Sequence, residues 1–158
     1  MKRYALTALS LLAGLALAAS VAAHCQIPCG IYDDELRVQL IEEHITTVEK
    51  SMKQVVALGN ADATDYNQLV RWVGNKEEHA QAIQDIVTAY FMAQRIKPAS
   101  EQSKAAHARY VKELTLLHQL LVTTMKAKQS TDLQQVEKAQ ALLAAFRKSY
   151  LGDKAHTH

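Results

Sequence analysis

Apolar residues recur at intervals of three and four along most of the chain after residue 33. This is the period of amphipathic helices and not the alternation typical of strands. Four such runs are separated by short breaks, and they predict helices over residues 34–58, 63–96, 100–129 and 131–151. Four long amphipathic helices with short connections favour an all-α, up-down-up-down four-helix bundle over residues 34–152.

Local signals mark the ends of these helices. Acidic and hydroxyl side chains stand where N-terminal caps belong, while Gly and Pro stand where helices stop. The expected starts are Asp33 or Asp34, a residue within 62–65, Ser100, and the capping-box sequence Thr131-Asp132-Leu133-Gln134. The expected stops are Gly59-Asn60, Lys97-Pro98 and Gly152.

The apolar positions of the four runs define the predicted core. They are Leu36, Leu40, Ile41, Ile45, Val48, Met52, Val55 and Val56 in the first run, Leu69, Val70, Val73, Ala80, Ile83, Ile86, Val87, Tyr90 and Phe91 in the second, Ala106, Tyr110, Leu114, Leu117, Leu121 and Met125 in the third, and Leu133, Val136, Leu143, Phe146 and Tyr150 in the fourth. Residues 153–158 follow the last run and are expected to form a flexible tail.

The first 23 residues form a predicted secretory signal peptide and not part of the fold. Lys2 and Arg3 give a basic start, an apolar stretch follows, and small residues provide a cleavage site after Ala23. The stretch is short and rich in Ala for a membrane anchor, so cleavage by a signal or processing peptidase is favoured over retention. We therefore expect a periplasmic or secreted protein that has no membrane anchor after cleavage.

Composition and charge narrow the possible partners. With 49% hydrophobic residues, the chain can bury a sizeable core, and its few Gly and Pro residues argue against a many-stranded β fold. Cleavage removes two of the 18 basic residues and none of the 16 acidic ones, so the mature chain is balanced in charge. No nucleic-acid partner is expected from such a balance.

The distinctive chemistry lies at the new N-terminus, His24-Cys25-Gln26-Ile27-Pro28-Cys29-Gly30-Ile31-Tyr32. Processing places a free α-amine beside an imidazole and a thiol, and such an amine can lose its proton near neutral pH. The amine, the next amide nitrogen and the two thiolates make a planar set of two nitrogens and two sulfurs, which suits nickel(II). The His24 imidazole remains as an axial ligand. Anionic donors also stabilise nickel(III), so such a centre can oxidise and reduce superoxide in turn.

The two cysteines by themselves allow other interpretations. In an oxidising compartment Cys25 and Cys29 can form a disulfide, and the spacing alone favours that outcome. Their three intervening residues do not fit the thioredoxin pattern, and no His follows Cys29 as haem attachment requires. A structural zinc site needs distant histidines as additional ligands.

This segment resembles the nickel hook of nickel-containing superoxide dismutases, His-Cys-x-x-Pro-Cys-Gly-x-Tyr, which stands at the mature N-terminus in that family. The six fixed residues all match, and they are His24, Cys25, Pro28, Cys29, Gly30 and Tyr32. Residues 71–80 also resemble part of the second helix of one branch of the family. Lys97-Pro98 resembles a Lys-Pro near its substrate entrance, about one residue out of register.

The resemblance implies one nickel ion per chain, bound by the His24 amine and imidazole, the Cys25 amide nitrogen and thiolate, and the Cys29 thiolate. It implies a cis peptide at Pro28 and a role for Tyr32 in ordering water and anion beside the metal. It also implies a homohexamer of four-helix bundles, each preceded by a hook at residues 24–33. The predicted function is superoxide dismutation by Ni(II)/Ni(III) cycling.

Some positions depart from the family pattern. Gln26 and Asp34 stand where well-studied members have Asp and Pro. Members orient the hook histidine through a Glu and an Arg. His79 stands at the second of these positions, and Glu42 and Glu43 are the candidates for the first.

Two alternatives to an efficient dismutase stay open from the sequence. One is a degenerate homologue that binds nickel but turns over slowly because Gln26 and His79 have replaced family residues. The other is a non-enzymatic periplasmic metal-handling or stress-adaptor bundle with a Cys25–Cys29 disulfide. The second alternative predicts no nickel and no requirement for a free amine.

Overall fold

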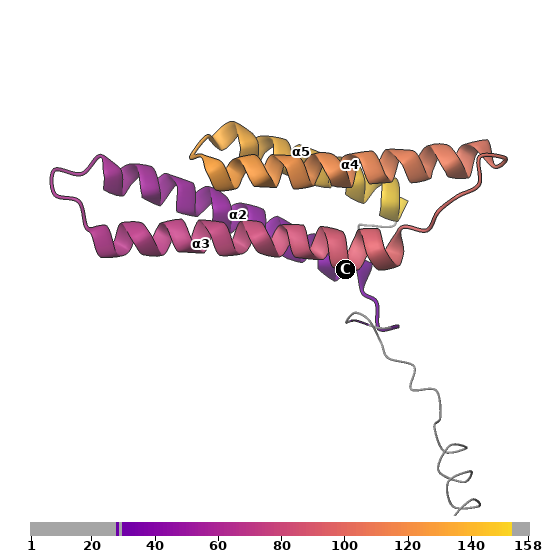
Figure 1. Ribbon diagram of the computed structural model, residues 1–158, viewed down its shortest axis with the longest axis horizontal. Coiled ribbons are helices and arrows are strands. Elements are labelled where there is room, and N and C mark those ends of the chain that lie inside the picture. The colour runs from indigo at the N-terminus through magenta and orange to yellow at the C-terminus, as the bar shows by residue number, and fades with distance from the viewer. Residues whose placement is uncertain (1–27, 29, 153–158) are drawn as a thin grey trace, which may run out of the picture. The chain divides into compact units, whose positions relative to one another are not determined.

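The computed structural model describes residue 28 and residues 30–152. Within this part the chain forms helices and no strand. The elements follow in the order α2 (Asp34–Gly59), α3 (Tyr66–Asp85), η1 (Ile86–Arg95), α4 (Lys104–Gln129) and α5 (Leu133–Leu151). Because η1 is a π-helix that continues α3, these two elements make a single rod (Figure 1).

Successive rods run antiparallel, and each packs against its two neighbours. α2 lies against α3 and α5, while α4 lies against α3, η1 and α5 (Figure 1). The described residues from Tyr32 onward belong to one compact unit, and those up to Ile31 belong to another. The predicted all-α, up-down-up-down bundle is confirmed.

Carboxylate caps begin three of the helices. Asp33 accepts a hydrogen bond from the Leu36 N–H at 3.0 Å, and Asp65 accepts one from the Gln68 N–H at 3.1 Å. The capping box predicted to begin with Thr131 is wrong, because Asp132 is the cap of α5 and accepts from the Gln134 N–H at 3.0 Å. Each cap satisfies a backbone N–H that the helix itself leaves without a partner.

Two predicted helix starts are displaced by three or four residues. α3 begins at Tyr66 and not at Ala63, because Asp65 is the cap. α4 begins at Lys104 and not at Ser100. The Ser100 hydroxyl accepts from the Gln102 N–H at 3.3 Å, a turn contact that competes with helix formation after Pro98.

Ten residues near the end of the second predicted helix, Ile86–Arg95, adopt the wider π geometry. The Ile96 N–H donates to the Phe91 carbonyl five residues earlier, at 2.8 Å, and the Gln94 side-chain amide donates to the Ala89 carbonyl at 2.8 Å. Amphipathic periodicity could not reveal this change, because a π segment is set by packing and often marks a functional site. Its last turn ends at Arg95.

Aromatic rings fill the centre of the apolar core. Phe91 and Phe146 are fully buried with edge-on rings 5.0 Å apart, and Tyr150 stacks on Phe146 at 5.3 Å between centroids. Full burial of one such side chain stabilises the fold by about 1.5–3 kcal/mol. The other buried apolar residues come from all four rods, and they include Val38, Ile41, Ile45, Val48, Met52, Ile83, Val87, Tyr90, Leu117, Leu120, Val136 and Leu143.

Several residues predicted for the core are exposed instead. They are Leu36, Val56, Val70, Val73, Ala106, Met125 and Leu133. In α4 the buried face overlaps the predicted stripe at Leu117 but also includes Thr123 and Thr124. The Thr124 hydroxyl donates to the Leu120 carbonyl at 2.8 Å within the helix, so a polar residue type occupies a buried position. None of the helices in the described residues is both long and apolar enough to cross a membrane.

Candidate functional site

The predicted metal ligands lie in the segment that precedes the bundle. His24, Cys25 and Cys29 fall outside the described residues. Gly30 is described and has a φ of +80°, in the left-handed region that side chains other than glycine rarely adopt. The backbone conformation at residue 30 therefore explains why the motif has a glycine directly after Cys29.

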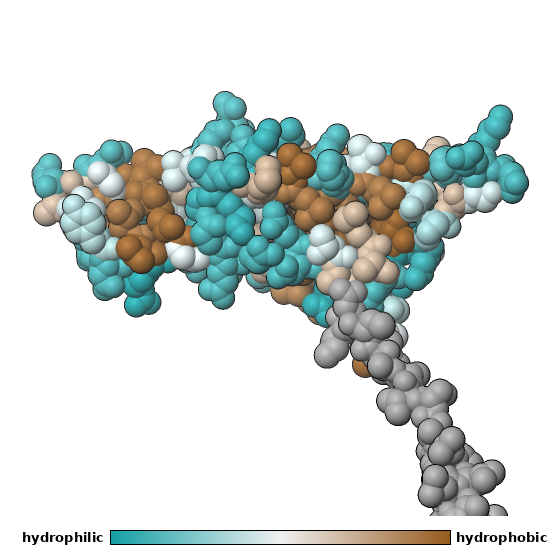
Figure 2. All heavy atoms as spheres, viewed as in Figure 1, coloured by the Kyte–Doolittle hydropathy of each residue, from teal (hydrophilic) through white to brown (hydrophobic). Residues whose placement is uncertain are grey.

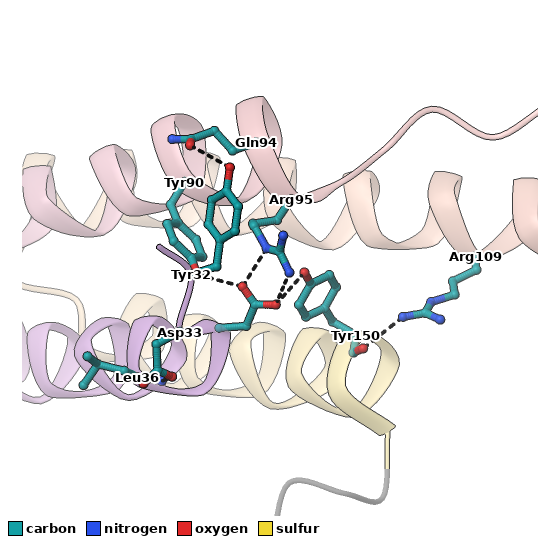
Figure 3. Close-up of polar contacts among 9 residues, drawn as sticks. Tyr32, Asp33, Leu36, Tyr90, Gln94, Arg95, Arg109 and Tyr150 are labelled. Atoms are coloured by element: carbon teal, nitrogen blue, oxygen red, sulfur yellow. Dashed lines mark hydrogen bonds and ion pairs between the residues drawn. The ribbon is translucent and has the colours of Figure 1, made fainter. Parts of the chain in front are cut away.

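Tyr32 is the predicted site residue that the structure describes, and the last turns of η1 hold it (Figure 3). The Arg95 guanidinium carbon lies 4.3 Å from the Tyr32 ring centroid, and the Tyr90 ring lies edge-on at 5.9 Å. The Tyr32 hydroxyl donates to Gln94 Oε1 at 3.4 Å. Since 40% of Tyr32 is exposed, one side of the residue is fixed and the other is open to solvent.

The Asp34 carboxylate joins three helices directly beneath this tyrosine. Its Oδ1 accepts from the Tyr90 hydroxyl at 2.7 Å and from Arg95 Nε at 2.7 Å. Its Oδ2 accepts from Arg95 Nη2 at 2.7 Å and from the Tyr150 hydroxyl at 3.0 Å. Because Asp33 serves as the cap of α2, the Asp34 carboxylate is available for these four bonds.

This network fixes the charges of its members. Burial raises the pKa of Asp34, but the hydrogen bonds from Arg95, Tyr90 and Tyr150 outweigh it, so the pKa lies below its usual value. The bond to Asp34 raises the pKa of Arg95. Burial and the bond to Asp34 raise the pKa of Tyr90, and they raise the pKa of Tyr150 to about 12. Asp34, Arg95 and the two tyrosines therefore act as a fixed brace and not as proton donors near neutral pH.

A second guanidinium, that of Arg37, lies over the ring of Tyr90. The Arg37 guanidinium carbon is 5.2 Å from the Tyr90 ring centroid. Its Nε is buried and has no hydrogen-bond partner among the described residues. Because the Arg95 charge is balanced by Asp34, Arg37 contributes positive potential beside the residues that follow the hook in sequence.

His79 belongs to a histidine pair that joins two helices. His79 Nδ1 lies 2.8 Å from His44 Nδ1, a hydrogen bond between α2 and α3. Glu42 and Glu43, the sequence candidates for its acidic counterpart, are exposed and line a shallow surface hollow with Gln39. Burial lowers the pKa of His44, and the His79 charge lowers it further, against an opposing effect of Glu43.

The sequence pattern did not indicate Arg95, Gln94 or the role of Asp34 in this site. Tyr90 and Tyr150 were placed in apolar stripes, where their hydroxyl groups still required partners. The doubled Asp33-Asp34 was a usable signal, because one carboxylate suffices for a cap and the other must serve elsewhere. Nothing in the sequence pattern identifies Arg95 as that partner.

The fit of a metal to the chain rests on the chemistry of the donor set. A terminal amine, an amide nitrogen, two thiolates and an imidazole suit nickel, which accepts square-planar nitrogen and sulfur ligation. Within residues 28 and 30–152, no group of three or more His, Cys, Asp or Glu side chains could hold a metal ion. In the sequence, His24, Cys25 and Cys29 supply donors of these types.

Comparison with known proteins matches the chain to one family. The family model for nickel-containing superoxide dismutases matches residues 19–154, which is most of the chain. Searches of curated proteins and of solved structures each found no match.

Proposed function

Because the chain belongs to the nickel-containing superoxide dismutase family, we propose that residues 24–33 form the nickel hook of its active site. The enzyme converts superoxide to dioxygen and hydrogen peroxide, and nickel is its cofactor. The ligands in this proposal are the His24 amine and imidazole, the Cys25 amide nitrogen and thiolate, and the Cys29 thiolate. The observation that carries the assignment is the complete six-residue motif directly after the expected cleavage site.

When bound, nickel supplies one-electron exchange between its +2 and +3 states, and the anionic thiolate and amide donors stabilise the higher charge. One superoxide ion loses an electron to become dioxygen, while a second gains that electron and two protons to become hydrogen peroxide. The protein must therefore admit an anion and keep water close to the reacting centre.

Tyr32 is the described residue best suited to that task. Its hydroxyl proton is directed to Gln94, so the lone pairs of its oxygen can accept a hydrogen bond from a water molecule. Tyr90 and Tyr150 differ, because their hydroxyl protons are committed to Asp34. Arg37 adds positive potential that favours the approach of the superoxide anion.

The proposal includes export and processing of the chain. Cleavage after Ala23 by a signal or processing peptidase exposes the amine of His24, and the protein then acts in the periplasm or outside the cell. The layout of residues 1–23 supports this part of the proposal. We also propose that the mature chain assembles with itself, as a hexamer by analogy with the family.

The test is metal content together with intact mass on protein purified from its exported fraction. We expect about one nickel per chain, a mass that begins at His24, and superoxide turnover that depends on the metal. A mass two protons lower and no nickel, even after reconstitution under reducing conditions, would overturn the hook and favour a Cys25–Cys29 disulfide. Nickel at full occupancy with negligible turnover would identify a degenerate member of the family.

A further inference from the structure

The hairpin formed by α2 and α3 extends beyond the turn that joins α4 to α5 (Figure 1). The end of α4 covers α3 only as far as Lys76. The Lys76 ammonium donates to the carbonyl oxygens of Lys128 at 2.5 Å and Ser130 at 3.2 Å, at the C-terminal end of α4. α3 begins ten residues before Lys76, at Tyr66. Residues 55–75 therefore form an arm whose outer end lies past the end of α4.

One face of this arm is apolar and open to solvent. Tyr66, Val70 and Val73 follow one another at steps of four and three along α3, and they are 74%, 69% and 39% exposed. Val56 adds an apolar side chain from α2 that is 45% exposed. Figure 2 shows apolar residues gathered at this end of the hairpin. We call these four residues the arm stripe.

The helical face that carries the stripe changes character where α4 begins to cover it. Glu77 continues the spacing, and its carboxylate lies 3.8 Å from the Lys128 ammonium of α4. Gln81 follows and accepts a hydrogen bond from the same ammonium at 2.9 Å. The face is therefore polar beside α4 and apolar beyond its end. If solvent exposure alone set the pattern, the uncovered part of this face would be polar and the part beside α4 apolar. The exposed apolar stripe therefore indicates an interaction surface.

We propose that the arm stripe pairs with the arm stripe of a second copy of this chain across a two-fold axis. The arm supplies two antiparallel helices of a bundle and lacks the two that would close it. A second arm offers two helices of the same length with the same apolar face, which is the self-complementary match that an isologous contact requires. Tyr66 is the most exposed member and is a residue type enriched among the dominant contacts of interfaces.

Charge around the stripe agrees with an antiparallel pairing. Asp62 and Asp65 stand at the tip of the arm, while Arg71 stands nearer its base. A two-fold axis near the middle of the stripe brings the acidic tip of one arm toward Arg71 of the other copy, which favours this orientation. The inference rests on the self-association proposed above and names the surface that carries it.

The first test is the mass in solution of the nickel-loaded mature protein, measured by light scattering after size exclusion. The double variant Tyr66→Ser, Val70→Asp should lower the mass by half or more, because loss of an isologous contact splits an assembly into equal parts. Val111→Asp is the matched control, since Val111 is an exposed apolar residue on α4 outside the arm, 45% exposed, and the mass should not change. Circular dichroism checks that each variant is folded. An unchanged mass for the double variant overturns the proposal.

A second variant tests whether the partner is a copy of this chain. With the hook thiols held by nickel, Val70→Cys should form disulfide-linked dimers under mild oxidation, whereas Val111→Cys should not. Absence of the Val70 cross-link overturns pairing across a two-fold axis and assigns the stripe to a different partner. Nickel content and superoxide turnover of the same samples report on the hook separately, so failure of one proposal is distinguishable from failure of the other.

Discussion

The Arg95 guanidinium donates to both carboxylate oxygens of Asp34, with each bond 2.7 Å long. The same guanidinium lies over the ring of Tyr32, so one ion pair links the tyrosine after the hook to the first turn of α2. A two-pronged ion pair fixes the plane of the guanidinium as well as its position. The orientation of Tyr32 therefore depends on a carboxylate two residues away in the sequence.

Removal of the Asp34 carboxylate should destabilise the bundle. Asp34→Ala leaves Arg95, Tyr90 and Tyr150 without their shared acceptor, and we expect a loss of about 2–3 kcal/mol in the free energy of unfolding. Urea unfolding at neutral pH measures this loss. Glu49→Ala removes an exposed ion pair with Lys53 and is the control, with an expected change under about 1 kcal/mol. Equal effects of the two variants would contradict the brace.

The low pKa of Asp34 predicts a loss of stability in acid. Because its folded-state pKa is depressed, the stability it contributes is present above the unfolded value of 3.8 and is lost as pH falls through the folded-state pKa. The melting temperature of the wild type should therefore fall more steeply below about pH 4 than that of Asp34→Asn. Parallel curves for the two proteins would show that Asp34 has no such role.

Tyr32→Phe should keep nickel and lose part of the activity. The variant retains the ring that stacks against Arg95 but lacks the hydroxyl, so kcat/KM should fall about fivefold, the size expected of one hydrogen bond of ~1 kcal/mol. Tyr150→Phe is the matched control, since its hydroxyl serves Asp34, and it should lower stability with little change in turnover per nickel. Full activity of Tyr32→Phe would remove Tyr32 from the mechanism.

A single residue added before His24 should abolish nickel-dependent activity. The added residue converts the His24 amine into a peptide amide and moves the free amine one residue further from Cys25, so the amine is lost from the ligand position. Nickel content and superoxide turnover should both drop to background in this protein. One residue added after His158 is the control and should have no effect. An extended N-terminus with full activity would refute the amine ligand.

The histidine pair predicts a second pH effect, at milder acidity. Burial and His79 depress the pKa of His44, so the folded protein resists protonation at a pH where the unfolded chain accepts it. Stability should fall as pH drops from the unfolded value of 6.5 toward the folded-state pKa. His44→Gln should flatten that part of the curve of melting temperature against pH. The exposed His118→Gln should leave it as in the wild type.

The sequence alone was sufficient where a signal is local. Helix periodicity predicted the four rods, and carboxylates and glycines near their ends predicted most boundaries within four residues. The hook motif identified the metal chemistry because its six residues lie within nine positions. The motif predicted Tyr32 as a site residue in the same way. These features depend on neighbours in the chain, and a pattern of neighbours is what a sequence contains.

Tertiary structure decided what depends on residues far apart in the chain. Asp34 and Arg95 are separated by 61 positions, and only the packing of η1 on α2 brings them together. The histidine pair joins α2 to α3 in the same way. The stripe of Tyr66, Val70 and Val73 has the periodicity of a core face, yet it is exposed because α4 ends before it. Periodicity predicts which face of a helix is apolar, whereas the lengths and offsets of the packed helices decide what covers that face.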